Sequence, residues 1–189
     1  SVTWALTQNG GDSETPTYTL TISGSGATQD FSHSGDYSTT NGPWATHNSE
    51  ITKIIVEDGI TYLGNYAFGN MTSVTELSIG KDLASFGNWA LSQMSGLTTI
   101  TVDEENTAYK VGADGALYSK DGTVLYVYPQ GKIAPNSSYT VPAEVKNVWK
   151  GAFKGAENII SLDLGGVTAI GDQAFLSTSI TEITVPSTV

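Results

Sequence analysis

The stretch ITYLGNYAFGNM at residues 60–71 recurs along the chain in altered form. The related segments are LASFGNWALSQM at 83–94, VKNVWKGAF at 145–153 and VTAIGDQAF at 167–175. When the copies are aligned on the pair Ala67-Phe68, each has an apolar residue five positions before the Phe position, and all but the third have a glycine four positions before it. Because glycine permits sharp backbone turns, each copy reads as a short extended piece that turns abruptly. The chain is therefore built from repeats of one structural unit.

Alternating apolar segments flank the copies, as expected for strands with one buried face. They cover residues 51–56, 74–79, 97–102, 159–164 and 180–185, and the first three are spaced by 23 residues. A fixed period of about 20 to 30 residues is typical of a solenoid, in which each unit buries one face against its neighbours.

The pattern within a unit predicts which side chains form the core. In VTELSI, we expect Val74, Leu77 and Ile79 to point inward and Glu76 and Ser78 outward. The segment NWALSQM at 88–94 has the spacing of one helical or 3₁₀ turn laid over the core. One core position is predicted to recur in every copy, filled by Phe68, Leu91, Phe153 and Phe175.

The pattern I-x-x-I-x-V followed by I-x-x-I-G-x-x-A-F resembles the BspA-like leucine-rich repeats, found mainly on surface and secreted proteins of anaerobic bacteria. The resemblance covers residues 50–189 and implies a right-handed, β-rich leucine-rich-repeat solenoid with short strands, turns and short helical or 3₁₀ pieces. The family often has a cysteine shortly after the Phe, whereas this chain has Met71 and Met94 near that place and no cysteine. In the third copy Trp149 replaces the turn glycine.

The repeat is interrupted once. Residues 83 to 145 span 62 residues, which is 16 more than two 23-residue periods. The excess contains GALYSKDGTVLYVYPQGK at 115–132, where Asp121-Gly122 between two alternating segments predicts a tight hairpin. We place this inserted β-hairpin at about 107–135, and it resembles the islands that interrupt such arrays in the family.

The first 49 residues differ in kind and are predicted to form a β-rich cap. Residues 4–7 and 18–26 alternate in polarity across a polar loop and predict a β-hairpin. A solenoid end exposes apolar surface that needs a cover. We expect Trp4, Leu20, Ile22 and Trp44 to provide it, and the segment resembles the leader that commonly precedes these repeats.

Composition excludes several classes of partner. The formal net charge is −11, and the eight basic residues are all lysines. Because nucleic-acid binding needs clustered basic side chains, we expect no nucleic-acid partner.

The sequence contains no expected membrane span, because no stretch approaches the roughly 20 apolar residues that such a span needs. No leader is visible, but the abrupt ends suggest a piece of a longer chain whose signal peptide has been removed.

Few residues suggest chemistry. His33 and His47, with Asp36, could approach a metal, but their spacing fits no known type of site. The cluster DEEN at 103–106 could hold Ca²⁺ weakly, although it lacks the alternating pattern of a calcium loop. Glu76, Asp163 and Glu182 fall on separate repeats, whereas glycoside hydrolysis needs two acids in one cleft. We therefore expect neither an enzyme nor a cofactor.

The outward strand positions form the candidate binding face, which we call the outward ribbon. Its residues are Lys53, Ile55, Glu76, Ser78, Thr99, Thr101, Ser161, Asp163, Glu182 and Thr184. Stacked across repeats, they are expected to make one continuous ribbon of small polar and acidic side chains. Such a face can be simply solvated, but in solenoids it is also the usual ligand surface. The aromatic residues Tyr62, Tyr66 and Trp89 near the turns are a further candidate.

The resemblance implies a role for the outward ribbon. It suggests a non-enzymatic, secreted or cell-surface bacterial module for binding or adhesion, whose partner is an extracellular protein or glycan. Two alternatives remain open at this point: a structural stalk in a larger surface protein, and an accessory binding region of a carbohydrate-active enzyme.

Overall fold

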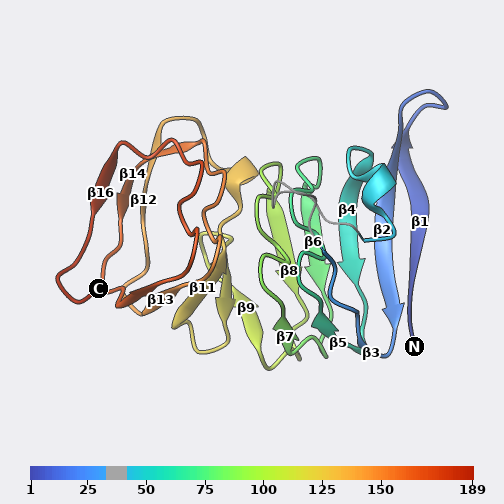
Figure 1. Ribbon diagram of the computed structural model, residues 1–189, viewed down its shortest axis with the longest axis horizontal. Coiled ribbons are helices and arrows are strands. Elements are labelled where there is room, and N and C mark those ends of the chain that lie inside the picture. Colours follow the sequence, from blue (N-terminus) through green and yellow to red (C-terminus); the bar gives the residue numbers. More distant parts are fainter. Residues whose placement is uncertain (33–41) are drawn as a thin grey trace.

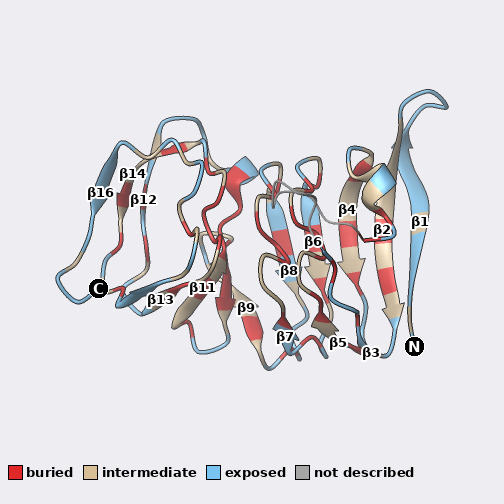
Figure 2. Ribbon diagram, viewed as in Figure 1, coloured by how far each residue is buried: buried red, intermediate tan, exposed pale blue. Residues whose placement is uncertain are grey.

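The computed structural model describes residues 1–32 and 42–189 and shows a solenoid whose strands succeed one another along the long axis of the molecule (Figure 1). Neighbouring coils pair in parallel, for example Leu77 with Ile54 on one side and Ile100 on the other. Buried residues alternate with half-buried or exposed ones along residues 53–56 and 76–79 (Figure 2). The solenoid predicted from the 23-residue spacing is confirmed.

The strands of the described residues form four sheets, two in each half of the molecule. In the N-terminal half, one sheet has the order β1 (Val2–Gly11), β2 (Pro16–Gly24), β4 (Ile51–Val56), β6 (Glu76–Ile79) and β8 (Thr99–Val102), and the second has β3 (Gly26–Ala27), β5 (Ile60–Leu63) and β7 (Ser85–Phe86). In the C-terminal half, one sheet has β12 (Ser137–Thr140), β14 (Ile159–Asp163) and β16 (Glu182–Thr184). The other has β15 (Ala169–Ile170), β13 (Asn147–Val148), β11 (Val124–Val127), β10 (Leu117–Ser119) and β9 (Tyr109–Val111).

The inward residues of the strands make the core, as their alternation predicts. Val74, Leu77 and Ile79 are each at most 1% exposed, and Phe68, Leu91 and Phe153 are buried at equivalent positions. Phe175 is only partly buried, which corrects the expectation of equal burial. It lies in the last described coil, so one side of its ring has no further coil to pack against.

The turns over the core are not helical, which corrects a second expectation. The arc from residue 64 to 71 consists of turns in which Ala67, Gly69 and Met71 donate backbone hydrogen bonds to residues three positions earlier. The amides in between, at Tyr66, Phe68 and Asn70, donate to carbonyls of the next coil. Every second amide therefore serves the neighbouring coil, an arrangement that a helix cannot provide.

This alternation requires left-handed backbone conformations at two positions in each arc. The first is filled by Tyr66, Trp89, Gly151 and Gln173, and the second by Asn70, Gln93, Gly155 and Ser177, all with φ between 53° and 75°. The two 3₁₀ helices of the described chain, Ala45–His47 and Gln130–Lys132, lie outside these arcs.

The interruption is a strand meander built into the solenoid. β10 pairs antiparallel with β9 and with β11, and β11 in turn pairs in parallel with β13 of the next coil. Asp121 accepts hydrogen bonds from the Thr123 amide (3.0 Å) and the Ser119 hydroxyl (2.6 Å), which fixes the turn between β10 and β11. Asn106 is buried at the entry to the meander and donates to the carbonyls of Gly80 and Leu83.

The N-terminal hairpin of β1 and β2 lies at one end of the molecule (Figure 1), and β2 pairs in parallel with β4 of the first repeat. Leu20, Ile22 and Trp44 are buried there, and the Trp44 indole donates to the Ala67 carbonyl at 3.0 Å. Trp4 is 42% exposed, contrary to expectation, because it lies on the outermost strand, where it contacts the Trp44 ring in a T-shaped arrangement. No helix among the described residues has the length and apolar character of a membrane span.

Candidate binding surface

The outward positions of the N-terminal sheet line up in two rows across its strands. Strand register places Lys53, Glu76 and Thr99 side by side, and Ile55, Ser78 and Thr101 beside them. All six are exposed or half-exposed. The sheet pairing thus brings these ribbon residues together as the alternation predicts.

The same two rows continue onto the N-terminal hairpin, which the sequence interpretation missed. Thr19 and Thr21 of β2 are in register with Lys53 and Ile55, and Thr7 and Ala5 of β1 extend the rows further. The signal was present, because residues 18–24 alternate in the same way as residues 51–56. The cap therefore shares its outer face with the repeats.

The outward ribbon is not continuous, which corrects the expectation of one unbroken face. Ser161, Asp163, Glu182 and Thr184 lie on the separate sheet β12-β14-β16, together with Ser138 and Thr140 of β12. Between β8 and β12 the chain makes the meander and the 3₁₀ helix Gln130–Lys132, so the two sheets are not hydrogen-bonded to each other. The molecule carries two ribbons, an N-terminal one and a C-terminal one.

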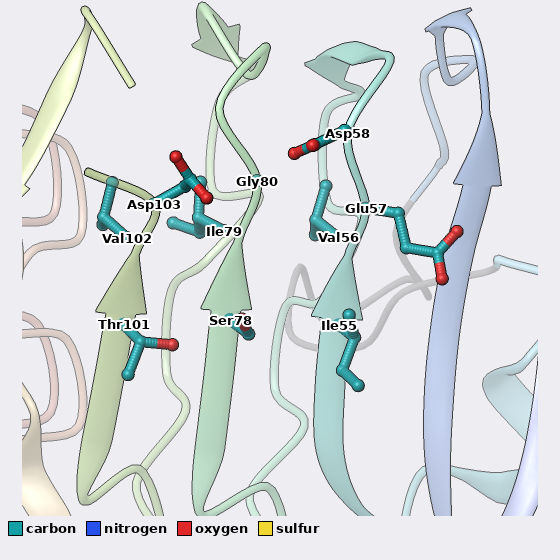
Figure 3. Close-up of a pocket in the computed structure, with 10 residues that line it drawn as sticks. All are labelled: Ile55, Val56, Glu57, Asp58, Ser78, Ile79, Gly80, Thr101, Val102 and Asp103. Atoms are coloured by element: carbon teal, nitrogen blue, oxygen red, sulfur yellow. The ribbon is translucent and has the colours of Figure 1, made fainter. Parts of the chain in front are cut away.

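The N-terminal ribbon ends in a shallow depression of about 510 Å³ (Figure 3). Ile55, Ser78 and Thr101 line its floor from three neighbouring strands, and Glu57, Asp58 and Asp103 lie where those strands end (Figure 3). Because parallel strands end at the same edge of a sheet, the acidic residues that follow them gather on one rim.

Charge on this rim is predominantly negative. The carboxylates in the segments after β4, β6 and β8 are Glu57, Asp58, Asp82, Asp103, Glu104 and Glu105, and the lysine among them is Lys81. Lys81 Nζ lies 3.5 Å from Glu105 Oε2, and that carboxylate, followed by Asp58, raises the lysine pKa. On the ribbon itself, Lys53 Nζ lies 2.9 Å from Glu76 Oε2.

Three rim aspartates also hold the turns in place. Asp58 accepts from the Lys81 amide at 3.0 Å, Asp82 from the Gly59 amide at 2.8 Å, and Asp103 from the Glu105 amide at 2.8 Å. The first two of these bonds connect successive coils. Glu57 and Glu104 are exposed and project their charge to solvent.

The metal candidates from the sequence find little support. His33 and Asp36 lie outside the described residues, and His47 Nδ1 contacts Glu50 Oε2 at 2.7 Å. In the acidic segment 103–106, the Asn106 amide nitrogen donates to a backbone carbonyl and its oxygen accepts from two backbone amides. Because this side chain is also only 1% exposed, it cannot serve as a metal ligand. Nowhere among residues 1–32 and 42–189 do three or more His, Cys, Asp or Glu side chains converge as a metal site requires.

The aromatic candidates near the turns contribute to packing. Tyr66 and Trp89 stack on each other with ring centres 5.4 Å apart, and the Tyr62 hydroxyl donates to Asp30 at 2.9 Å. All three rings are half-buried. They connect successive coils and do not form one exposed stacking platform.

Comparison with known structures returns similar solenoids. A leucine-rich repeat protein from Eubacterium ventriosum ATCC 27560 is 22% identical, with a TM-score of 0.45 over 87% of this chain and 63% of that one. A leucine-rich cell surface protein from Faecalibacterium prausnitzii A2-165 is 16% identical, with a TM-score of 0.47 over 97% and 75%. The pneumococcal vaccine antigen PcpA is 16% identical, with a TM-score of 0.44 over 100% and 69%.

The chain thus spans less than two thirds of the Eubacterium protein. Comparison with curated proteins gave no match. The BspA type leucine rich repeat region, in contrast, matches in six copies over residues 36–113 and 133–189. The gap between these ranges contains β10 and β11 of the meander. With more than half of its length matched, the chain belongs to the BspA-type leucine-rich repeat family.

Proposed function

We propose that the chain is a non-enzymatic binding module of a secreted or cell-surface bacterial protein, and that its N-terminal ribbon binds a basic patch on an extracellular protein. The observation that carries this proposal is the rim of carboxylates at the end of the two rows that form the N-terminal ribbon. An acidic surface attracts basic partners over a distance and speeds their association.

The shape of the ribbon suits a protein surface better than a small molecule. The depression is shallow, and side chains such as Ser78 and Thr101 are too short to enclose a ligand. Short side chains on a flat sheet allow a partner to approach the backbone closely. They also lose little rotamer entropy when they become ordered. Ile55 adds an apolar contact within the row that it shares with Ser78 and Thr101.

The arrangement of acids speaks for binding and against hydrolysis. Glu76 is exposed and paired with Lys53, and Asp163 and Glu182 lie on the other sheet. Hydrolysis of a glycosidic bond needs two carboxyl groups roughly 5 to 10 Å apart around one substrate, with one of them in an apolar setting. We therefore place no catalytic step on these residues.

Surface plasmon resonance with immobilised chain tests the proposal. The probes are a panel of extracellular matrix proteins, lysine-rich peptides and glycans. We expect a protein partner whose association slows as salt rises above physiological strength, where screening acts over about 8 Å. The double variant Glu57→Lys with Glu76→Lys should weaken binding. Both side chains are exposed, so losing the ion pair to Lys53 and placing a second lysine opposite it costs on the order of 1 kcal/mol of stability.

The matched control is Glu14→Lys with Glu157→Lys, which changes the net charge equally at two exposed positions off the ribbon. Equal loss in both double variants would show that total charge matters and the ribbon does not. A partner that binds both variants like the unaltered chain would place the site elsewhere. If the whole panel fails to bind, the chain is better described as a stalk.

A further inference from the structure

Strand β1 leaves one of its edges unpaired in the described structure. It is the outermost strand of its sheet, and β2 is the only strand of residues 1–32 and 42–189 that is hydrogen-bonded to it. At ten residues it is also the longest strand in that part of the chain. Residues 2–11, VTWALTQNGG, contain no charged residue and no proline. Proteins commonly protect such edges with lysine, proline, bulges or very short strands.

The other sheet edges of the described chain show this protection, mainly through their length. The edge strands β3, β7, β8, β9, β12, β15 and β16 have four residues or fewer. β9 carries Lys110 and β16 carries Glu182. The only irregularity in β1 is the register shift between Gln8 and Gly10, which leaves residues 2–8 regular. β1 is therefore exceptional in its availability for pairing.

The residues that face the free edge follow from one hydrogen bond. The Ser25 amide donates to the Ser1 carbonyl at 3.2 Å, so the backbone groups of residue 1 point toward β2. In an antiparallel pair the polar groups of successive residues point to opposite sides. The amides and carbonyls of Val2, Trp4, Leu6 and Gln8 therefore point away from β2 and can pair with another strand.

We propose that β1 pairs antiparallel with β1 of a second copy of this chain, about a two-fold axis through Ala5. This register places residue 2 opposite residue 8 of the second copy and residue 4 opposite residue 6. All four are residues with free backbone groups, so about eight hydrogen bonds form. A symmetric pair of this kind is closed and does not grow into a filament.

The side chains are self-complementary in the same register. Val2 and Leu6 pack against the core on the inner face of β1, and Trp4 contacts Trp44 there. Trp4, which is 42% exposed in the single chain, would lie opposite Leu6 of the second copy and would be covered by it. On the outer face, Thr3 would lie opposite Thr7 of the second copy, and Ala5 opposite Ala5.

Charge favours this arrangement over other ways of bringing two copies together. Each chain carries −11, so two copies repel at low salt. The contact strand is uncharged, and the acidic tip with Asp12 and Glu14 lies at one end of it. Antiparallel pairing directs the two tips to opposite ends. Dimerisation should therefore strengthen as salt rises, whereas binding of a basic partner should weaken.

The pairing would join two five-stranded sheets edge to edge, with the N-terminal ribbons on the same outer face. A partner with repeated basic patches would then meet two ribbons, and avidity would raise its apparent affinity. The dimer itself does not depend on whether the ribbon binds such a partner.

Sedimentation equilibrium over a range of protein and salt concentrations tests the pairing. We expect a monomer–dimer equilibrium. Ala5→Lys and Ala5→Glu should each weaken it several-fold, because like charges then lie opposite each other across the axis. An equimolar mixture of the two variants should restore dimerisation as a heterodimer. Ser138→Lys, an exposed strand position in the C-terminal half, is the control and should dimerise like the unaltered chain.

A second measurement uses the absence of cysteine from the chain. Ala5→Cys should form an intermolecular disulfide under mild oxidation, because residue 5 occupies a non-hydrogen-bonded pair whose Cα atoms are about 4.5 Å apart. A chain that stays monomeric at every concentration and salt, a dimer unaffected by Ala5→Lys, or a mixture of the charge variants that stays monomeric would each overturn the proposal. Selective capture of an unrelated extended peptide by monomeric β1 would also overturn it.

Discussion

Lys150 Nζ donates a 3.0 Å hydrogen bond to Asn88 Oδ1, across 62 residues of sequence, and lies 6.0 Å from the centre of the Trp89 ring. Residues in neighbouring regular repeats are separated by 21 to 23 positions, as in the 23-residue separation of the Asn88 amide and the Asn65 side chain that accepts its hydrogen bond. On the turn side, the arc around Lys150 therefore packs directly against the arc around Trp89. The meander between them extends along other sides of the solenoid.

The close packing of these arcs makes the glycine at the second left-handed position important. Gly155 has φ 75°, and a Cβ there would lie 3.2 Å from Gln93 Cγ. Gly155→Ala should therefore destabilise the chain by more than about 1 kcal/mol. Urea unfolding followed by circular dichroism measures the change.

The equivalent residue of the next coil provides the converse test. Ser177 has φ 58° and is exposed, so Ser177→Gly should stabilise by about 0.4–1 kcal/mol, because glycine adopts this conformation without strain. Ser179→Gly, two residues further on and without a positive φ, is the control and should be neutral or destabilising. Destabilisation by Ser177→Gly would argue against the left-handed arc.

Burial of the repeated aromatic position predicts unequal costs of truncation. Phe153 is fully buried and packs with Tyr128, Tyr139 and Phe175, so Phe153→Ala should cost about 3–5 kcal/mol. Phe175→Ala should cost clearly less, because its ring already touches solvent. Denaturant titration of both variants checks the order, and equal losses would contradict the difference in burial between Phe153 and Phe175.

The strands could be predicted from sequence because apolar and polar residues alternate in them, as in Glu76–Ile79. The arcs could not, because the first two copies fill their left-handed positions with Tyr66, Asn70, Trp89 and Gln93, where no glycine signals the conformation. The spacing of Ala90, Leu91 and Met94 also imitates a helical turn. Only the third copy, with Gly151 and Gly155, carries a sequence signal for the arc.

The candidate surface was predictable in part. Its residues follow from strand alternation, and its extension onto Thr19 and Thr21 could have been found in the same way. The break between the two ribbons after Thr101 could not be predicted. The length of the inserted meander can be read from the sequence, but not the side of the coil on which the meander lies. The rim likewise depends on three turns ending at one edge, which only the sheet register establishes.

A buried pair of tyrosines predicts sensitivity to alkaline pH. Tyr118 and Tyr139 both donate to Asp114 Oδ2, at 2.6 and 2.5 Å, and their hydroxyl oxygens are 3.0 Å apart. Burial, followed by the hydrogen bonds to Asp114, raises the pKa of each phenol. Because the folded pKa exceeds the unfolded value of about 10, this contribution to stability is complete below pH 10 and is lost as pH rises above it.

Two conservative variants separate the hydrogen bond from the burial. Tyr139→Phe should lower stability at pH 7 by about 1.5–3 kcal/mol, because it removes a hydrogen bond to a charged group. Its stability should also fall less steeply above pH 10, since one buried phenol fewer remains to ionise on unfolding. Tyr128→Phe is the matched control: that hydroxyl is buried without a hydrogen-bond partner among the described residues, and burial raises its pKa as well. Its removal should be neutral or stabilising at pH 7, and it should likewise make the loss of stability above pH 10 less steep.

Urea unfolding between pH 7 and 11, with tyrosinate absorbance as a second readout, distinguishes the two variants. Equal destabilisation at pH 7 would mean that Asp114 contributes nothing specific, and an unchanged alkaline fall in both would mean that these phenols ionise in the folded chain.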